Sequence, residues 1–334
     1  MTRHLRTALL GLSLVVTAAA VGCSPAPGEA SSEGTTSSGG AAGSSSSGST
    51  GTPASSSSGS SSSGGGSGGG GGSSTTTSTG GGSSTSTGSG ALDAGAGDGL
   101  DPSVAPGGNF DLSLWELQEP IGSPGAPTTI LPAALEGPKG FHDSYFYTDP
   151  TDGAMTFWDP EDGVMTANSS YPRSELREMT ASGAAANWPV AGTNTLSVSV
   201  AVTQVPDHVC VGQIHLGTAI QSGLAASTKP LLELYYYATG KLELGIEDGP
   251  TGNQTVHDIT TIPLGTKFSY TIVLAGDGTI TLVVDGATST FTMPASFNGY
   301  GMYFKAGDYD QTAGTSGSVG ATVKIYALAV SHAP

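Results

Sequence analysis

Apolar and polar residues alternate in short runs from residue 109 to the end of the chain. The clearest run covers residues 195–203, where every second residue from Leu196 to Val202 is Leu or Val, as expected of a half-buried strand. Seven further runs predict strands, at residues 109–116, 231–237, 241–247, 267–274, 279–284, 300–306 and 320–331. No segment keeps a helical period beyond a turn or two, so the pattern predicts an all-β domain.

Turn signals separate the predicted strands. Asp277-Gly278 lies between two of them and is typical of a hairpin turn, and Asp285-Gly286 closes the next strand. Strands joined in this way bury one face each and pack as two sheets. The pattern therefore favours a β-sandwich, and a jelly roll is the version we expect.

One stretch, Tyr171-Pro-Arg-Ser-Glu-Leu-Arg-Glu178, combines strand-like alternation with concentrated charge. It contains Arg173 and Arg177, the only arginines after the first six residues. Read as a strand, it puts its odd-numbered residues, with Glu175 between the two arginines, on one face. Arginine binds carboxylates bidentately, so the stretch predicts a clamp for an anion. A solvated charged face is the alternative interpretation.

Two later stretches share this arrangement. Gln213 and His215 flank an apolar residue, and Tyr303, Lys305 and Tyr309 share a parity. Each stretch alone is also compatible with a satisfied polar pair or with ordinary surface residues. Their common parity predicts three strand faces that meet in one cleft.

These residue types suit β-elimination from a uronic acid polymer. Candidates for neutralising the sugar carboxylate are Arg173 and Gln213, aided by Arg177 or His215. Neutralisation would stabilise the negative charge that develops as the C5 proton leaves. A base must remove that proton, and an acid must protonate the departing O4. Tyr309 can do both if neighbouring cations lower its pKa from about 10, and His215, with an unperturbed pKa of about 6.5, is a second candidate base.

Other kinds of site fit less well. A zinc site is disfavoured because His208 and Cys210 have the opposite parity to His215 and match no common zinc spacing. No nucleophile-elbow signature supports Ser-His-Asp chemistry. Glu175 and Glu178 are candidates for a glycosidase pair, but their opposite parity keeps them out of one cleft. We therefore expect neither a metal nor a cofactor.

The predicted domain is strongly acidic. Five of the 27 acidic and two of the ten basic residues precede residue 105, which leaves a net charge of −14 for residues 105–334. Such a body disfavours nucleic acid as a partner. Screening beyond about 8 Å still allows a local basic cleft to bind an anionic polymer. The acidic run between residues 149 and 162 could bind calcium, although solvated turn residues are the simpler interpretation.

The N-terminal residues predict export. Residues 1–22 resemble a signal peptide, and the sequence Ala20-Val-Gly-Cys23 resembles a bacterial lipoprotein cleavage box. We expect lipidation of Cys23, with ordinary secretion as the alternative. Residues 23–104 are almost entirely Ser, Gly and Thr, which predicts a flexible tether with an end-to-end distance of about 50 Å, with a glycosylated stalk as the alternative.

Residues 105–334 are expected to form a single domain. If Cys23 is lipidated, Cys210 has no disulfide partner. Cys210 shares parity with Ile214 and Leu216, so we expect it on the apolar side, as an inert core residue.

At the three stretches the chain resembles the alginate lyases of polysaccharide lyase family seven. The signatures of that family read here as Arg-Ser-Glu-Leu-Arg-Glu (173–178), Gln-Ile-His (213–215) and Tyr-Phe-Lys-Ala-Gly-Asp-Tyr-Asp-Gln (303–311). The resemblance covers residues 105–334. It implies a β-jelly roll with a cleft across one sheet, and metal-independent depolymerisation of alginate into unsaturated oligosaccharides.

The resemblance also implies roles for individual residues. It makes Arg173, Gln213 and His215 the carboxylate neutralisers, with His215 doubling as a base, and Tyr309 the acid and base. It makes Glu175, Arg177, Lys305 and Tyr303 substrate-binding residues. Asp308 and Asp310 stand where asparagine is more usual, and their charges could raise the pKa of Tyr309 or weaken a subsite.

Two other functions stay open at this point. A non-catalytic module that binds polyuronates would need the arginines but would have no use for the pair of His215 and Tyr309. A lyase acting on glucuronan or another polyuronate would keep the same chemistry. We expect a monomer whose partner is an anionic polysaccharide, alginate, and which contacts a membrane only through its N-terminal lipid.

Overall fold

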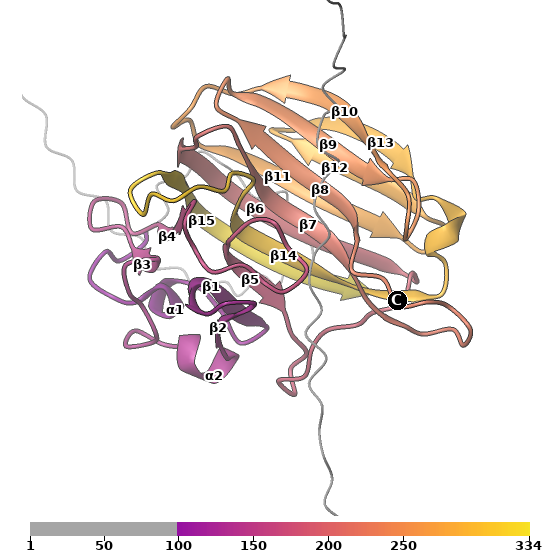
Figure 1. Cartoon of the computed structure of the whole chain (residues 1–334), viewed down its shortest axis with the longest axis horizontal. Helices are drawn as coiled ribbons and strands as arrows, with labels where there is room; N and C mark the ends of the chain where they lie inside the picture. Colours follow the sequence, from indigo (N-terminus) through magenta and orange to yellow (C-terminus); the bar gives the residue numbers. More distant parts are fainter. Residues whose placement is uncertain (1–98) are drawn as a thin grey trace, which may run out of the picture. The chain divides into compact units, whose positions relative to one another are not determined.

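The computed structural model describes residues 99–334. The predicted signal peptide, the lipidation site Cys23 and most of the predicted tether lie outside the described residues. Within the described part, two antiparallel sheets lie face to face, and the apolar core fills the space between them (Figure 1). The predicted all-β jelly-roll sandwich is confirmed. Among the described residues, no helix has the length and apolar character needed to cross a bilayer.

The eight-stranded sheet carries the candidate site. Its strands, in order across the sheet, are β10 (Gln254–Thr261), β9 (Lys241–Glu247), β8 (Pro230–Tyr237), β7 (His208–Ala219), β14 (Tyr300–Asp310), β5 (Ser174–Glu178), β1 (Trp115–Ser123) and β2 (Ala126–Ile130). We call the face of this sheet that points away from the second sheet the site face.

The second sheet has seven strands. In order they are β13 (Ala287–Thr292), β12 (Thr279–Val284), β11 (Phe268–Ala275), β6 (Thr193–Gln204), β15 (Gly320–Ala333), β4 (Met155–Pro160) and β3 (Phe146–Thr148). The only helical elements among the described residues are α1 (Pro106–Asn109), α2 (Pro132–Leu135) and the 3-10 turn η1 (Ala295–Phe297).

The alternating run predicted as a strand forms the centre of this second sheet. β6 pairs with β11 on one side and β15 on the other, and the Leu and Val residues from Leu196 to Val202 are fully buried. Asp285 and Gly286 both have positive φ, 46° and 83°, and join β12 to β13 as a two-residue turn of the type that matches strand twist.

Some strand boundaries differ from the prediction. β9 and β12 begin and end at the predicted residues, whereas only the last two residues of the predicted strand 109–116 lie in a strand, β1, and the rest of that prediction is wrong. There α1 ends at Asn109, and Asp111 then turns the chain by accepting hydrogen bonds from the backbone N–H and hydroxyl of Ser113, at 3.1 and 2.6 Å. β10 and β13 escaped prediction because their residues are mostly polar and exposed, so they carry no alternation of buried positions.

The folded body begins before residue 105. Leu100 packs against the core, and the backbone of Asp101 exchanges two hydrogen bonds of 2.9 Å with the side chain of Asn109. Residues 100–104, which were assigned to the tether, therefore belong to the domain.

A β-bulge in β7 changes which side chains reach the site face. Cys210 pairs with Tyr235 and Gly212 with Leu234, so Val211 is an extra residue relative to β8. The hydroxyl of Tyr270, from the second sheet, donates a 2.7 Å hydrogen bond to the carbonyl of Val211. A Cβ atom on Gly212 would lie 2.5 Å from that hydroxyl oxygen, so only glycine fits beside it.

The bulge overturns the prediction for Cys210. Val209 and Val211 face the core, and Cys210 packs with Tyr235 and Tyr309 on the site face, where it is fully buried. The parity argument that set His208 and Cys210 apart from His215 therefore fails, because parity reverses at the extra residue. Cys210 nevertheless remains a buried thiol, and burial raises its pKa well above the ordinary value.

Candidate active site

The three predicted stretches meet on adjacent strands. In the pairing of β14 with β7, Tyr303 lies opposite His215 and Lys305 opposite Gln213, and in the pairing of β14 with β5, Lys305 lies opposite Arg177. Neighbouring positions on one face of a sheet bring side chains into contact. The predicted convergence therefore occurs at the centre of the eight-stranded sheet.

A cavity of about 710 Å³ opens over this part of the site face. Five predicted residues line it, namely Arg173, Arg177, His215, Tyr303 and Lys305. Gln213, Glu175 and Tyr309 are not among the lining residues and are buried beside it. The cavity thus presents three cationic side chains in a protein of formal net charge −17, which favours an anionic ligand.

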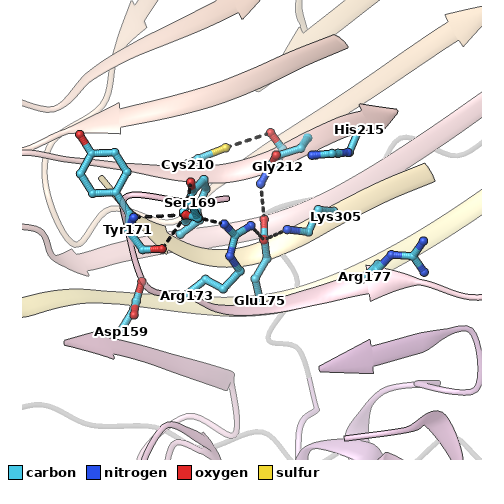
Figure 2. Close-up of polar contacts among 12 residues, drawn as sticks. Asp159, Ser169, Tyr171, Arg173, Glu175, Arg177, Cys210, Gly212, His215 and Lys305 are labelled. Carbon is cyan, nitrogen blue, oxygen red and sulfur yellow. Dashed lines mark hydrogen bonds and ion pairs between the residues drawn. The ribbon is translucent and has the colours of Figure 1, made fainter. Parts of the chain in front are cut away.

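Glu175 organises the cationic side of the cavity. Its carboxylate forms ion pairs with Lys305 and, at 3.4 Å, with Arg173 (Figure 2). It also accepts a hydrogen bond of 2.6 Å from Gln213 Nε2. Glu175 is fully buried. Because its carboxylate is already engaged by Lys305, Arg173 and Gln213, Glu175 acts as a positioning residue and not as the substrate contact that was predicted.

Aromatic rings hold the two arginines in place. The guanidinium carbon of Arg173 lies 3.8 Å from the centroid of the Tyr309 ring, and that of Arg177 lies 4.0 Å from the Tyr303 ring. The Tyr303 ring in turn stacks on the His215 ring, with centroids 5.1 Å apart. A guanidinium stacked on a ring presents its N–H groups at its edge, where an anion can bind them.

The hydrogen bonding of His215 fixes its tautomer. Nδ1 lies 2.8 Å from the carbonyl oxygen of Leu216, and because a carbonyl only accepts, the proton is on Nδ1. Burial, and then the positive charge of Lys305, lower the pKa of His215 to about 3. His215 is therefore neutral and carries no positive charge to offset a carboxylate, and its unprotonated Nε2 can accept a proton, although the lowered pKa makes it a weaker base than free imidazole.

Tyr309 is covered by the segment that leads into β5. The hydroxyls of Tyr309 and Ser169 are 3.1 Å apart, and the Tyr171 ring packs edge-on against the Tyr309 ring. Ser169 Oγ also accepts a 3.1 Å hydrogen bond from Arg173 Nη2. Figure 2 shows Ser169 between Tyr171 and Arg173.

Three carboxyls lie buried around the Tyr309 segment. Asp308 and Asp310 flank Tyr309 in β14, and Asp159 Oδ2 accepts a 3.0 Å hydrogen bond from the backbone N–H of Asp310. Burial and mutual repulsion raise the pKa of Asp159 and Asp308 well above the ordinary value, and burial raises that of Asp310 to about 6. The departure from asparagine at Asp308 and Asp310 thus adds buried carboxyls whose raised pKa values favour the protonated form.

The acidic run at residues 149–162 is not gathered at one point. Asp149 and Asp152 form ion pairs with Lys324, at 2.6 and 3.1 Å, whereas Asp159 is buried beside β14. The ammonium group of Lys324 thus lies between the carboxylates of Asp149 and Asp152.

Comparison with known proteins agrees with this geometry. The sequence profile of the family described as "Alginate lyase" matches residues 110–332. The chain belongs to the alginate lyase family. A curated alginate lyase from Klebsiella pneumoniae is 29% identical over 265 residues, which cover 62% of this chain and 84% of that protein.

Solved structures of alginate lyases share the fold. The alginate lyase from Pseudomonas aeruginosa superposes with a TM-score of 0.60 at 33% identity, covering 67% of this chain and 100% of that one. A variant of the family 7 alginate lyase A1-II′, solved in complex with a substrate, gives a TM-score of 0.60 at 38% identity, covering 69% of this chain and 97% of that one.

Sequence reasoning missed several residues that line the cavity of this alginate lyase family member. Glu116 and Gln118 project from β1, and Glu116 lies 3.7 Å from Arg177. Their alternation with the buried Trp115 and Leu117 was visible in the sequence and would have identified them. Ser169 lies in an irregular segment, where periodicity carries no signal.

Proposed function

We propose that this protein depolymerises alginate by β-elimination and releases unsaturated oligosaccharides. The observation that carries the proposal is the placement of Arg173, Lys305 and the neutral His215 around one cavity, from the residue that precedes β5 and from the strands β14 and β7. Membership of the alginate lyase family supports it, as does the relative solved with a substrate bound.

The cations act on the sugar carboxylate. Arg173 is the principal neutralising group, because its guanidinium is held by both Glu175 and the Tyr309 ring and lines the cavity. Gln213, which already donates one amide N–H to Glu175, assists through its amide group. Neutralisation lowers the cost of the enolate-like charge that develops as the C5 proton leaves. The polymer also contacts Arg177, Lys305 and Tyr303.

Two groups can transfer the protons. His215 Nε2 or the Tyr309 oxygen removes the C5 proton, and the electron pair of the C5–H bond forms the C4–C5 double bond. The C4–O4 bond breaks, and the Tyr309 hydroxyl protonates O4. Arg173 beside the ring and Lys305, whose Nζ lies 5.9 Å from the ring centroid, place positive charge next to the phenol.

Incubation of the purified protein with alginate tests the proposal. The expected result is a rise in ultraviolet absorbance from the new double bond, in step with the release of reducing ends. Reducing ends without that absorbance would indicate a hydrolase, and binding without any cleavage would indicate a non-catalytic module. Product analysis on defined mannuronate and guluronate blocks then gives the preferred substrate.

We further propose that the enzyme is exported and held at a membrane by a lipid on Cys23, with residues 24–99 as the tether, and that it acts as a monomer. The support is the sequence around Cys23 and the Ser, Gly and Thr composition that follows. A Cys23→Ala variant should move from the detergent phase to the aqueous phase on Triton X-114 partitioning. A wild-type protein found in the aqueous phase would contradict the anchor.

A further inference from the structure

We propose that Ser169 is a positioning residue that couples the carboxylate clamp to the acid and base, by binding Arg173 and Tyr309 through one oxygen atom. The inference rests on the proposed lyase function. Its physical basis is that the two groups must act in the same step, the guanidinium on the carboxylate and the phenol on the proton.

The hydrogen bonds of Ser169 can be counted. A serine hydroxyl has one proton to donate and two lone pairs to accept with. Ser169 Oγ lies 2.8 Å from the carbonyl oxygen of Tyr171, which can only accept, so the hydroxyl proton points there. The lone pairs then accept from Arg173 Nη2 and from the Tyr309 hydroxyl, each at 3.1 Å. The backbone N–H of Tyr171 lies 3.2 Å from the same oxygen and, as a longer contact, shares one of these two lone pairs. In this arrangement Tyr309 is protonated and donates.

The same hydroxyl can reverse its role when Tyr309 loses its proton. A phenolate oxygen accepts only, so it would repel the lone pairs of Ser169. Rotation of the serine hydroxyl gives up the bond to Tyr171 and directs the proton to the phenolate, which forms a stronger, charge-assisted bond. Ser169 can therefore serve both protonation states of Tyr309 without moving its oxygen, and Arg173 stays bound throughout.

Neighbouring contacts hold Ser169 in position for this role. The Tyr171 ring packs against the Tyr309 ring with centroids 6.4 Å apart, and the backbone N–H of Ser169 donates to Thr166 at 3.1 Å. The Arg173 guanidinium covers the Tyr309 ring. The serine oxygen is thus placed where the edge of the guanidinium and the phenol hydroxyl come together.

A Ser169→Ala variant tests the proposal, with rates measured on alginate by double-bond absorbance across a range of pH. We expect kcat to fall roughly tenfold to a hundredfold, the range expected for a lost hydrogen bond to a charged group. The limb of the pH profile that reports ionisation of Tyr309 should move to higher pH, because the phenolate loses its donor. A Ser169→Thr variant, which keeps the hydroxyl, should restore both values.

Ser170→Ala is the matched control, since that neighbouring hydroxyl makes none of these contacts, and it should behave as wild type. An unchanged kcat and pH limb in Ser169→Ala would overturn the proposal. So would a loss of thermal stability without a shift of the limb, or a Ser169→Thr variant that folds but stays slow. Failure of the lyase function itself is distinguishable, because the wild-type protein would then produce no double-bond absorbance at any pH.

Discussion

The guanidinium carbon of Arg173 lies 3.8 Å from the centroid of the Tyr309 ring. One side chain therefore both lines the cavity, where we propose that it binds the sugar carboxylate, and stacks on the phenol that we propose as the proton-transfer group. A planar, delocalised cation can do both, whereas an ammonium group cannot stack on a ring in the same way.

Substitution of that cation is the first test. Arg173→Lys keeps the charge but loses the planar fork and the ring contact, so we expect kcat/KM to fall by about a hundredfold or more. Arg177→Lys is the comparison, because Arg177 is partly exposed and pairs with Glu116, and its loss should be smaller. Steady-state rates on alginate measure both. If both variants lost only a little kcat/KM, and to the same extent, Arg173 would not be the principal neutralising group.

Glu175 offers a test of positioning. Glu175→Gln leaves the buried cations of Lys305 and Arg173 without their carboxylate, which should cost about 3–5 kcal/mol of unfolding free energy and most of the activity. Denaturant unfolding gives the free energy. Adding Lys305→Met to Glu175→Gln removes one stranded charge, so the double variant should regain stability but not activity. A Glu175→Gln variant as stable as wild type would show that the cations find other partners.

The neutral state of His215 predicts the pH dependence of the reaction. Because burial and Lys305 lower the pKa of His215 to about 3, the imidazole stays neutral above about pH 4. The rate should therefore show no rising limb at the ordinary histidine pKa of about 6.5. A pH profile of kcat/KM, together with an NMR titration of the His215 ring, checks this. An imidazole titrating near its ordinary value would contradict the geometry.

A buried glutamate in β1 predicts how stability changes with pH. Burial, and then the neighbouring Asp143 carboxylate, raise the pKa of Glu119 from 4.5 to about 8. A carboxyl whose folded pKa is raised holds its proton in the native state, so stability is lost as pH rises through about 8. The melting temperature of Glu119→Gln should therefore decrease less than that of the wild type as the pH rises from acidic values to about 8. Glu136→Gln, at an exposed glutamate, is the control and should follow the wild-type curve.

Asp308 leads to a related expectation. Both of its carboxyl oxygens are buried without a hydrogen-bond partner, and burial together with Asp159 and Asp310 raises its pKa well above the ordinary value. Asp308→Asn removes the cost of ionising this group, so it should stabilise the protein increasingly as pH rises from acidic to neutral. Unfolding free energies of the variant and the wild type, measured at an acidic and at a neutral pH, give the change in stability. An equal destabilisation at both pH values would show that asparagine cannot pack at position 308.

The sequence by itself determined the fold class, the family and most of the site. Alternation with period two marks strands wherever one face is buried, and it gave the correct parity for Arg173, Glu175, Arg177, Gln213, His215, Tyr303, Lys305 and Tyr309. For most of these residues it worked because β5, residues 213–215 of β7 and residues 303–306 of β14 keep a regular pleat. Tyr309 reaches the same face although β14 shifts register against β7 between Ala306 and Tyr309.

Only the tertiary structure decided which position and role each of those residues has. The bulge at Val211 moved Cys210 to the site face, because an extra residue reverses parity and depends on Tyr270 from the other sheet. Burial turned Glu175 into a support and kept His215 neutral, because both effects depend on which groups surround a side chain in space. Ser169 joined the site for the same reason, since its contacts with Arg173 and Tyr309 join a loop to a distant strand.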